Sequence, residues 1–307
     1  MYLVTGAAGF IGSHIAQTLV ERGRRVRVFD NLSTGKPENL EGWQEGAEVI
    51  RGDLRNADDV AEAVKGVRYV LHQAAVPSVP KSVEDPLGTN ESNITGTLNL
   101  LLAAREEGVQ RVVFASSSSV YGDLPSLPKR ETDPTIPLSP YALQKLTGEH
   151  YMRQFHSLYG LETVCLRYFN VFGPRQDPES LYAAVIPRFI TAVAEGGRPT
   201  IYGDGLQTRD FTYVQNVVEA NLGALEAPNA AGQVINVAAG VKTSLLDLLE
   251  VLSGIFDTEI DPVFEDERPG DIKHSVASND RAGELLDFEI VVDLEQGLRR
   301  TVEWFTR

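Results

Sequence analysis

Tyr141 and Lys145 lie four residues apart, and together they could carry out acid–base chemistry. They belong to the segment SPYALQKLTGEHYMRQF, in which Ser139 is a candidate N-cap and Pro140 a favourable first residue of a helix. Residues four apart on a helix share one face. An ammonium beside a phenol stabilises the phenolate and lowers a pKa that is otherwise about 10. The pair therefore predicts a tyrosine general base, although YxxxK also occurs often by chance.

A row of four serines, Ser116 to Ser119, follows the apolar run RVVFA. By composition alone the row is typical of a flexible linker, but a linker should not begin with a buried strand. We therefore expect hydroxyl groups at the C-terminal end of a strand. Ser117 is the candidate that acts together with Tyr141 and Lys145, and strand-end capping is the expected role of Ser116.

A glycine-rich turn follows the first apolar run, with Gly6, Gly9 and Gly12 in GAAGFIG. Such a turn lets the backbone approach a pyrophosphate and aims the amides of the next helix at it. Asp30 ends the next strand, 18 residues beyond Gly12, close to the ~20 expected of a carboxylate that binds the adenosine ribose. A carboxylate there repels a 2′-phosphate, which favours NAD over NADP. Asp53 is a candidate for the adenine or, equally, for a helix N-cap.

The elements that must position these residues alternate between strands and helices, which predicts an α/β fold of Rossmann type, a doubly wound parallel sheet. A smaller, mixed α/β substrate lobe should follow. The expected domains are residues 1–168 with about 211–238 for NAD, and 169–210 with 239–307 for the substrate. Buried strands are expected at residues 2–6, 25–31, 47–53, 68–75, 111–118, 163–171 and 234–240.

Composition narrows the classes of partner. The chain of 307 residues carries a net charge of −15, which disfavours nucleic acids and anionic membranes. No apolar run of about 18 residues exists, and no basic leader precedes the first apolar residues, so we expect neither a membrane span nor a secretory signal. A single cysteine, Cys165, fits a reducing compartment, and the cytoplasm is the expected location. The histidine spacing suggests no metal site.

The motifs together resemble the extended short-chain dehydrogenase/reductase family, which contains nucleotide-sugar epimerases and dehydratases. The resemblance runs through TGAAGFIG, Asp30–Asn31, GDLRN, HQAA, SSSSVYG, YALQK, RYFNVFGPRQDP and ERPGD. Within the family, the stretch from Arg175 to Phe189 is most similar to UDP-N-acetylglucosamine 4-epimerases. Gln144 departs from the small Ser or Thr that relatives usually carry before the lysine, which puts the local packing in doubt.

The resemblance implies roles for individual residues. Ser117 would hydrogen-bond the sugar 4-hydroxyl together with Tyr141. NAD would be bound by Gly6, Gly9, Phe10, Ile11, Gly12, Asp30, Asn31, Ser33, Gly35, Asp53, Leu54, Gln73, Ala74, Ala75, Lys145 and Tyr168. A UDP-sugar would be bound by Ser78, Lys81, Ser118, Ser119, Asn170, Ala184, Val185, Tyr202, Arg209, Arg268, Asp271 and Ser275.

Among the substrate residues, Arg209 and Arg268 could bind the pyrophosphate through forked, charge-assisted hydrogen bonds, and Asp271 the uridine ribose. Without the family, Arg209 and Asp210 could equally be a surface ion pair, and ERPGD an acidic turn. The small Ser275 occupies the position at which a bulky residue excludes an N-acetyl group. The resemblance therefore implies UDP-GlcNAc/UDP-GalNAc, UDP-Glc/UDP-Gal, or both.

Ser118 and Ser119 separate the reaction types. Related 4,6-dehydratases carry Asp and Glu at these two positions, and decarboxylases usually carry Glu before VYG. Without a carboxylate there, the expected chemistry is reversible oxidation at C4 through a 4-keto sugar, a UDP-hexose 4-epimerase. The alternatives are a UDP-glucuronate 4-epimerase, another nucleotide-sugar enzyme of the family or, least favoured, a non-catalytic NAD-binding protein. The resemblance also implies a homodimer formed by helices around residues 91–107 and 140–159.

Overall fold

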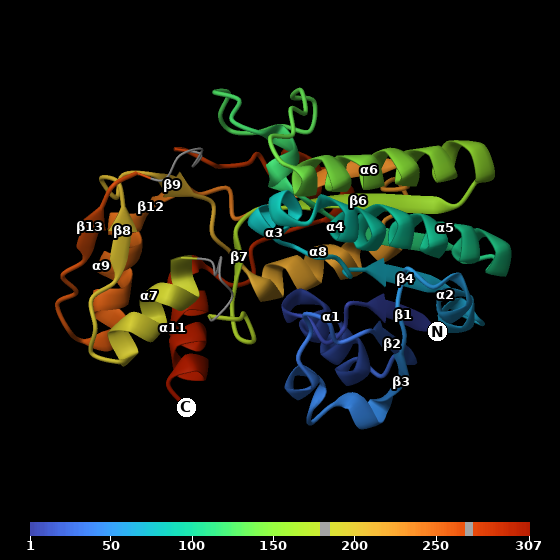
Figure 1. Cartoon of the computed structure of the whole chain (residues 1–307), viewed down its shortest axis with the longest axis horizontal. Coiled ribbons are helices and arrows are strands. Elements are labelled where there is room, and N and C mark those ends of the chain that lie inside the picture. The colour runs from blue at the N-terminus through green and yellow to red at the C-terminus, as the bar shows by residue number, and fades with distance from the viewer. Residues whose placement is uncertain (179–184, 268–272) are drawn as a thin grey trace.

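The computed structural model describes residues 1–178, 185–267 and 273–307 and forms two lobes (Figure 1). The larger lobe contains a seven-stranded sheet in the order β11-β6-β5-β4-β1-β2-β3. All of its strand pairs are parallel, which confirms the predicted fold class. The strands are β1 (Tyr2–Thr5), β2 (Val26–Asp30), β3 (Ala47–Arg51), β4 (Tyr69–His72), β5 (Arg111–Ser117), β6 (Glu162–Tyr168) and β11 (Gln233–Val237).

The strand order reverses at β1, which pairs with β2 on one side and β4 on the other. Successive connections therefore leave this point in opposite directions, an arrangement that in open α/β sheets produces a crevice beyond the carboxyl ends of the two strands. Ligands of open α/β sheets bind at such a switch point. Both the glycine turn after β1 and the segment after β4 lie there.

Helices cover both faces of the sheet. On one face α1 (Phe10–Glu21) and α8 (Val214–Glu226) pack in one apolar cluster. On the other face α2 (Ala57–Val64), α5 (Gly96–Glu107) and α6 (Pro140–Tyr159) pack in a second cluster. Burial on both faces explains the continuous apolar runs of the central strands. The short helices and turns are η1 (Pro37–Leu40), η2 (Gln44–Gly46), α3 (Val79–Glu84), α4 (Pro86–Asn90), the π-helical turn η3 (Glu91–Thr95) and η4 (Ser118–Tyr121).

The expectation of a buried strand is wrong for β3. Three of its five residues are exposed, and the Val49 side chain is 50% exposed. The strand pairs with β2 alone and forms the edge of the sheet. A β-branched sequence therefore predicted the strand correctly but not its position in the sheet.

The smaller lobe is built around a third apolar cluster, to which its three helices contribute. They are α7 (Val185–Ala194), α9 (Leu245–Phe256) and α11 (Leu294–Phe305). Three two-stranded ladders connect its loops. They pair β7 (Val171–Phe172) with β10 (Thr212–Tyr213), β8 (Thr200–Tyr202) with β13 (Val263–Glu265), and β9 (Thr208–Arg209) with β12 (Thr243–Ser244).

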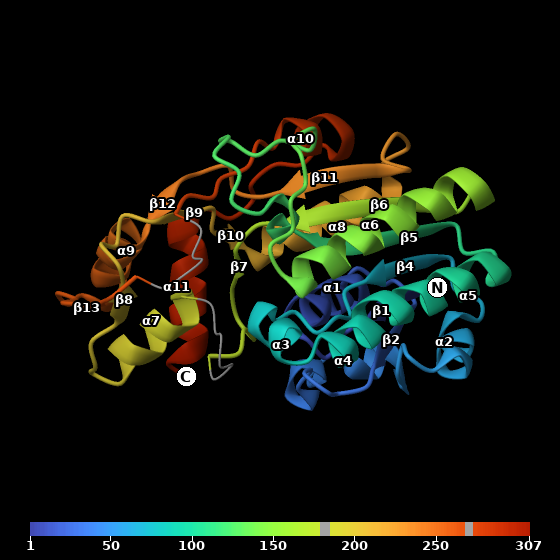
Figure 2. The same ribbon diagram turned by 45° about the horizontal axis from the view of Figure 1, so that its top comes forward.

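The chain crosses between the lobes several times. As expected, α8 and β11 return to the main sheet. A further helix, α10 (Asp280–Leu286), contacts β11 and packs in the core of the larger lobe through Ala282 and Leu286 (Figure 2). This helix packs in the larger lobe although it lies within residues 239–307, which the sequence analysis assigned to the substrate-binding lobe. The exact lobe limits remain a prediction.

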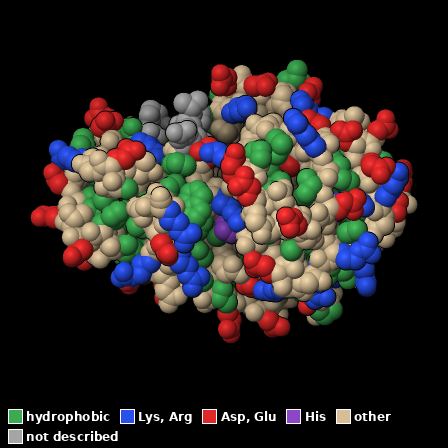
Figure 3. Space-filling model, turned by 90° about the horizontal axis from the view of Figure 1, so that it is seen from below, with side chains coloured by type: hydrophobic (Ala, Val, Ile, Leu, Met, Phe, Trp, Pro, Cys, Tyr) green, Lys and Arg blue, Asp and Glu red, His purple; other side chains and the backbone are tan. Residues whose placement is uncertain are grey.

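The charged side chains are distributed over the surface. On the face seen from below, acidic and basic side chains are interspersed, with hydrophobic side chains between them (Figure 3). Among the helices of the described residues, none has both the length and the apolar character needed to cross a bilayer.

Candidate active site

The helix that carries Tyr141 begins as the sequence predicts. The Ser139 side chain accepts a hydrogen bond from the amide of Ala142 at 3.2 Å, and Pro140 is the first helical residue. The Tyr141 amide, which has no partner within the helix, donates to Ser82 Oγ on α3 at 3.0 Å. Ser82 is fully buried. Sequence reasoning missed this residue, which attaches α3 directly to the start of α6, the helix that carries the candidate catalytic residues.

Lys145 lies one turn further along α6 and is buried. Its Nζ donates to the carbonyl oxygen of Ala115 on β5 at 2.8 Å. The same nitrogen lies 5.9 Å from the centre of the Tyr141 ring. The structure therefore brings the two predicted catalytic residues together on one face of the helix.

The protonation of the pair differs from the expectation. Burial raises the pKa of Tyr141 to about 12, and a side-chain hydrogen bond with Ser117 opposes this rise. Burial also lowers the pKa of Lys145 to about 8. In the protein alone, loss of solvation thus outweighs the Ser117 hydrogen bond in setting the pKa of Tyr141, and the expectation that Lys145 depresses this pKa stays a prediction.

The serine row is a strand end followed by a turn, as predicted. Ser116 is buried, and its hydroxyl donates to Glu149 Oε1 at 2.5 Å, so the expected strand-end capping role is wrong. Ser117 ends β5, opposite Tyr168 of β6, and is the N-cap of η4. Ser117 Oγ accepts hydrogen bonds from the amide of Ser119 at 3.2 Å and from its hydroxyl at 2.9 Å.

Glu149 connects the catalytic helix to the sheet through a buried ion pair. Arg167 on β6 donates two hydrogen bonds to its carboxylate, at 2.8 and 2.7 Å. The two side chains are 3% and 5% exposed. Burial and the bonds to Glu149 act in opposite directions on Arg167, and the net effect raises its pKa. Arg167 therefore stays charged, and its two hydrogen bonds to Glu149 fix α6 against β6.

We expect Arg167→Met to lower the free energy of unfolding by about 3–5 kcal/mol, because it leaves the Glu149 carboxylate buried without its cation. Urea unfolding measures the loss. The matched control is Arg299→Met, which breaks the exposed pair between Arg299 and Glu295 and should change stability little. Adding Glu149→Leu to Arg167→Met should restore part of the loss. A variant as stable as the wild type would contradict the structural role of the pair.

The glycine turn has the geometry of a dinucleotide cradle. Gly6 has φ of +67°, and a Cβ there would lie 2.7 Å from backbone atoms of Ala74. A Cβ at Gly12 would lie 2.1 Å from the Gly6 carbonyl oxygen. Gly9, the N-cap of α1, makes no side-chain cap, and the first turn of this helix holds no acidic residue. The amides that open α1, including those of Phe10 and Gly12, thus remain available to an anion.

Asp30 faces this turn from the end of β2. Its carboxylate accepts from the amide of Ala8 at 2.9 Å and from the amide of Leu32 at 2.8 Å. Each carboxylate oxygen keeps a lone pair for a ribose hydroxyl. Gly35 packs closely here as well, because a Cβ on it would lie 2.7 Å from the Ala8 side chain.

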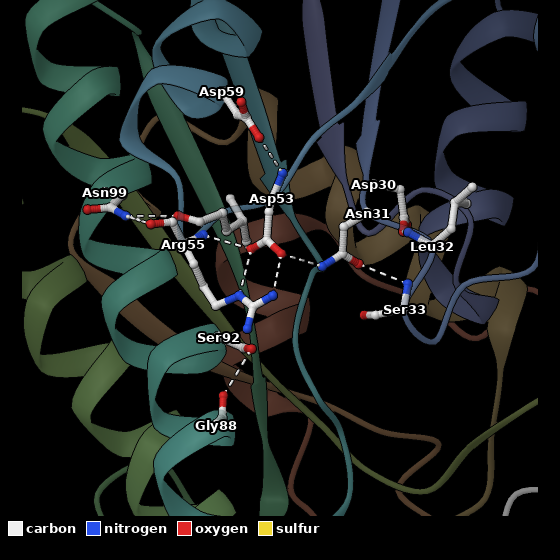
Figure 4. Close-up of polar contacts among 11 residues, drawn as sticks. Asp30, Asn31, Leu32, Ser33, Asp53, Arg55, Asp59, Gly88, Ser92 and Asn99 are labelled. Atoms are coloured by element: carbon white, nitrogen blue, oxygen red, sulfur yellow. Dashed lines mark hydrogen bonds and ion pairs between the residues drawn. The ribbon is translucent and has the colours of Figure 1, made fainter.

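Asn31 links the segments that follow β2 and β3 (Figure 4). Its amide nitrogen donates to Asp53 Oδ2 at 2.9 Å, and its oxygen accepts from the Ser33 amide at 2.9 Å. Arg55 donates three hydrogen bonds to Asp53, two from its side chain, and these lower the pKa of that carboxyl. The helix that follows is capped by Asn56, so the N-cap alternative for Asp53 is wrong.

Gln73 and Tyr168 meet deeper in the crevice. The Tyr168 hydroxyl lies 3.2 Å from Gln73 Oε1 and 3.0 Å from Asn221 Oδ1. Asn221 on α8 also accepts from Gln73 Nε2 at 3.1 Å. Sequence reasoning missed Asn221, which is fully buried on α8. Its helical spacing from Val217, Val218 and Leu225, which puts an amide on the apolar face of the helix, was the available signal. The Ala74 amide donates a hydrogen bond to Thr5 Oγ1 at 3.3 Å. Leu54 is buried.

The predicted sugar residues come from both lobes. Ser78 caps α3, with Oγ accepting from the amide of Lys81 at 3.2 Å. Ser275 donates its amide to Thr208, adjacent to Arg209, at 3.1 Å. Lys81 on α3 and Asn170 after β6 are exposed. Ser118 and Ser119 are the first residues of η4, Val185 is the first residue of α7, and Tyr202 is the last residue of β8. Ala184, Arg268, Asp271 lie outside the described residues, and Ala75 follows β4.

Asp210 is not part of a surface ion pair, so that alternative is wrong. It is fully buried and accepts from the amides of Ala239, Gly240 and Ala277. Burial raises its pKa to about 6. The aspartate joins its own segment to those of Ala239–Gly240 and Ala277, whereas the Arg209 guanidinium donates to the carbonyl oxygen of Thr208 at 3.0 Å.

Gln144, the departure from the family pattern, is accommodated by hydrogen bonds. It is 3% exposed and accepts from Asn93 Nδ2 at 2.7 Å while donating to Thr89 Oγ1 at 2.9 Å. Asn93 lies in the π-helical turn η3 and accepts from the Val76 amide at 2.7 Å. The larger side chain thus ties the catalytic helix to the segment after β4, which removes the doubt about local packing.

Residues 2–238 match the model of the NAD dependent epimerase/dehydratase family. The chain belongs to this family. The resemblance inferred from the sequence is therefore confirmed, and NAD is the cofactor. The cradle around Gly6, the open N-terminus of α1 and the carboxylate of Asp30 fit that group.

Several named relatives cover nearly the whole chain. The UDP-glucose 4-epimerase of Mycolicibacterium smegmatis is 40% identical over 99% of this chain and 97% of its own length. The structure of UDP-N-acetylglucosamine 4-epimerase from Methanobrevibacter ruminantium, in complex with UDP-N-acetylmuramic acid, is 46% identical with a TM-score of 0.95, over 99% of this chain and 97% of that one. The structure of a UDP-glucose 4-epimerase from Thermotoga maritima with UDP-glucose is 38% identical in sequence and has a TM-score of 0.94. The match covers 99% of this chain and 98% of that one. The chain is accordingly an isomerase.

Proposed function

We propose that this protein is a UDP-hexose 4-epimerase, which interconverts sugars through a transient ketone at C4. The observation that carries the proposal is the convergence of Ser117 and Lys145 on Tyr141 at the carboxyl edge of the sheet, beside the dinucleotide cradle. Ser118 and Ser119 supply no carboxylate for an elimination or a decarboxylation. The names of the relatives support the same reaction.

In this proposal the protein binds, orients and deprotonates the sugar. The Tyr141 phenolate takes the proton of the 4-hydroxyl, and Ser117 orients the oxygen that loses it. Lys145 holds the Ala115 carbonyl and places its charge one turn from the phenol. Bound NAD+ supplies the hydride acceptor and a positively charged ring that favours the phenolate. The cofactor would be held by the amides of α1 and by Asp30.

Product analysis tests the reaction. We would incubate the purified protein with UDP-Glc, UDP-GlcNAc and UDP-GlcA in separate reactions, separate the products by chromatography, and record their masses. We expect a slower- or faster-eluting epimer of unchanged mass from at least one of the two hexoses. Loss of the mass of water or of carbon dioxide would instead identify a dehydratase or a decarboxylase. Conversion of UDP-GlcA alone would identify the uronate epimerase.

Our proposal for the preferred sugar depends on the size of the side chain at Ser275. We propose that its small side chain leaves room for an N-acetyl group, so that both acetylated and plain hexoses are accepted. Support comes from its position beside Thr208, next to Arg209, which we propose binds the pyrophosphate together with Arg268. Asn170 and Asp271 would complete the contacts with the nucleotide.

We expect Ser275→Tyr to lower kcat/KM for UDP-GlcNAc by at least about a hundredfold, since a side chain that fills the acetyl space is worth ~3 kcal/mol or more of discrimination. The value for UDP-Glc should stay within about threefold. Initial rates with both sugars measure the ratio, and Ser275→Ala, which stays small, is the matched control. Equal losses on the two sugars would contradict the assignment.

We further propose a homodimer in the cytoplasm. Leu87 on α4 and Leu143 and Leu158 on α6 are 70%, 54% and 66% exposed, which is the surface that a helical interface would bury. The free, buried thiol of Cys165 is compatible with a reducing compartment. Sedimentation equilibrium tests the dimer, because a mass of 33.6 kDa at micromolar concentration would be that of the single chain.

A further inference from the structure

Ser119 makes two contacts with one atom, Ser117 Oγ. Its backbone amide donates at 3.2 Å and its hydroxyl donates at 2.9 Å. Both serines lie at the junction of β5 and η4, and both are half-buried. The family resemblance assigned Ser119 to the wall of the sugar pocket. In the structure its hydroxyl proton is instead used within the protein.

These contacts determine what Ser117 can do. A serine hydroxyl has one proton to donate and two lone pairs that accept. The amide of Ser119 can only donate, so it uses one lone pair of the Ser117 oxygen. A Ser119 hydroxyl that donates to the same oxygen uses the other lone pair and leaves the Ser117 proton to be donated outward. Tyr141 is a partner on that side, through a side-chain hydrogen bond with Ser117.

A donor is what the proposed reaction needs at this place. Negative charge sits first on the Tyr141 oxygen and then develops on the sugar O4 as its proton leaves. A hydroxyl that presents its proton stabilises both oxygens, whereas one that presents a lone pair repels them. A free hydroxyl rotates between these orientations, and ordering it beforehand removes that cost from the reaction.

We propose that Ser119 is a positioning residue that fixes the hydroxyl of Ser117 as a donor toward Tyr141 and the sugar O4. The inference rests on the proposed 4-epimerase function and deepens it. It also gives a reason for a serine at position 119. A carboxylate in the same place has no proton to donate and would accept the Ser117 proton, turning the hydroxyl away from the reacting oxygens.

The kinetic test uses the isosteric pair Ser119→Thr and Ser119→Val, which differ in one hydroxyl. We expect Ser119→Val to lower kcat about tenfold, the effect of one well-placed hydrogen bond, with KM changed less than about twofold. Ser119→Thr should keep kcat within about threefold of the wild type. A raised KM with unchanged kcat in Ser119→Val would place Ser119 against the sugar and overturn the proposal.

A double-mutant cycle separates positioning from direct contact. If Ser119 acts through Ser117, adding Ser119→Val to Ser117→Ala should cost less than about twofold beyond Ser117→Ala alone, because the atom that it positions is gone. Independent, multiplying losses would overturn the proposal. Circular dichroism and the thermal midpoint identify variants that fail to fold, and Ser119→Ala then replaces Ser119→Val.

A titration that needs no turnover keeps the inference testable by itself. The purified protein is labelled with fluorotyrosine, whose phenol titrates in an accessible pH range, and the Tyr141 resonance is identified by its loss in Tyr141→Phe. Loss of the Ser117 donor weakens the phenolate, so Ser119→Val and Ser117→Ala should both raise the Tyr141 midpoint, whereas Ser119→Thr should not. A shift in Ser117→Ala without one in Ser119→Val would overturn the proposal. A protein inactive on every UDP-sugar would defeat the proposed function and leave this result standing.

Discussion

Tyr141→Phe is expected to lower kcat by about two to four orders of magnitude, the range that a general acid–base group contributes. The substitution removes one oxygen, the atom that hydrogen-bonds to Ser117 and that would take the 4-hydroxyl proton. The phenylalanine ring keeps the position of the helix, because Ser82 is bonded to the backbone of residue 141 and not to its side chain. The variant should therefore fold normally and retain NAD.

Steady-state rates and the NAD content of the purified variant measure the two outcomes separately. Tyr151→Phe is the matched control. Tyr151 lies on the same helix, but it is a partly buried residue that packs against the apolar cluster of the larger lobe. We expect its kcat to stay within about twofold of the wild type. Near-normal turnover of Tyr141→Phe would show that another group removes the proton, and loss of NAD would show that the ring has a structural role.

Lys145→Met should combine a loss of activity of about two orders of magnitude or more with a gain in stability at neutral pH. Burial holds the folded-state pKa of Lys145 at about 8 against an ordinary value of 10.5. The difference, 10.5 − 8, means that the charged lysine destabilises the fold at pH 7 by roughly 3 kcal/mol. Losing the bond to Ala115 offsets part of the gain, so we expect a net increase of about 1–2 kcal/mol.

The pH dependence gives this prediction its sign. Between about pH 8 and 10.5 the unfolded lysine is protonated while the folded one is not, so the stability of the wild type rises with pH through this window. The methionine variant has no such contribution, and its advantage should disappear by the top of the window. Urea unfolding at pH 7 and pH 10.5 measures it, with Lys65→Met as an exposed control. A variant less stable than the wild type by the same amount at both pH values would contradict the prediction.

These two effects have one physical origin. The site places a phenol and an ammonium in a buried position, where each pKa moves in the direction that favours its neutral form. Neighbouring contacts offset the free-energy cost of burying Tyr141 and Lys145. They include the Glu149–Arg167 ion pair and the hydrogen bond between Asn93 and Gln144. We therefore expect removal of the buried charge of Lys145 to stabilise the protein while lowering its activity.

Local chemistry allowed much of the fold to be predicted. The strand–turn–helix around Gly6 follows from a backbone conformation with positive φ that glycine adopts readily. The start of α6 follows from Ser139 and Pro140, whose preferences act within one turn. The pairing of Tyr141 with Lys145 follows from helical periodicity. The parallel sheet follows from alternating apolar strands and helices, and the glycine turn with Asp30 predicted NAD before the family resemblance was considered.

Contacts between distant segments decided the rest. Nothing near Asp53 in the chain shows that Asn31 and Arg55 would bind it while Asn56 caps the helix. Ser82 and Asn221 become part of the site because the fold carries them there from α3 and α8.

The sequence by itself determined which groups are present, where the strands of the main sheet and the start of α6 lie, and which residues share a helical face, because those properties depend on neighbours within a few residues. The tertiary structure decided how the groups behave. It set the hydrogen-bond partners of Ser117, the pKa values of Tyr141 and Lys145, and the exposure of β3, because hydrogen bonding and solvation depend on everything packed around an atom.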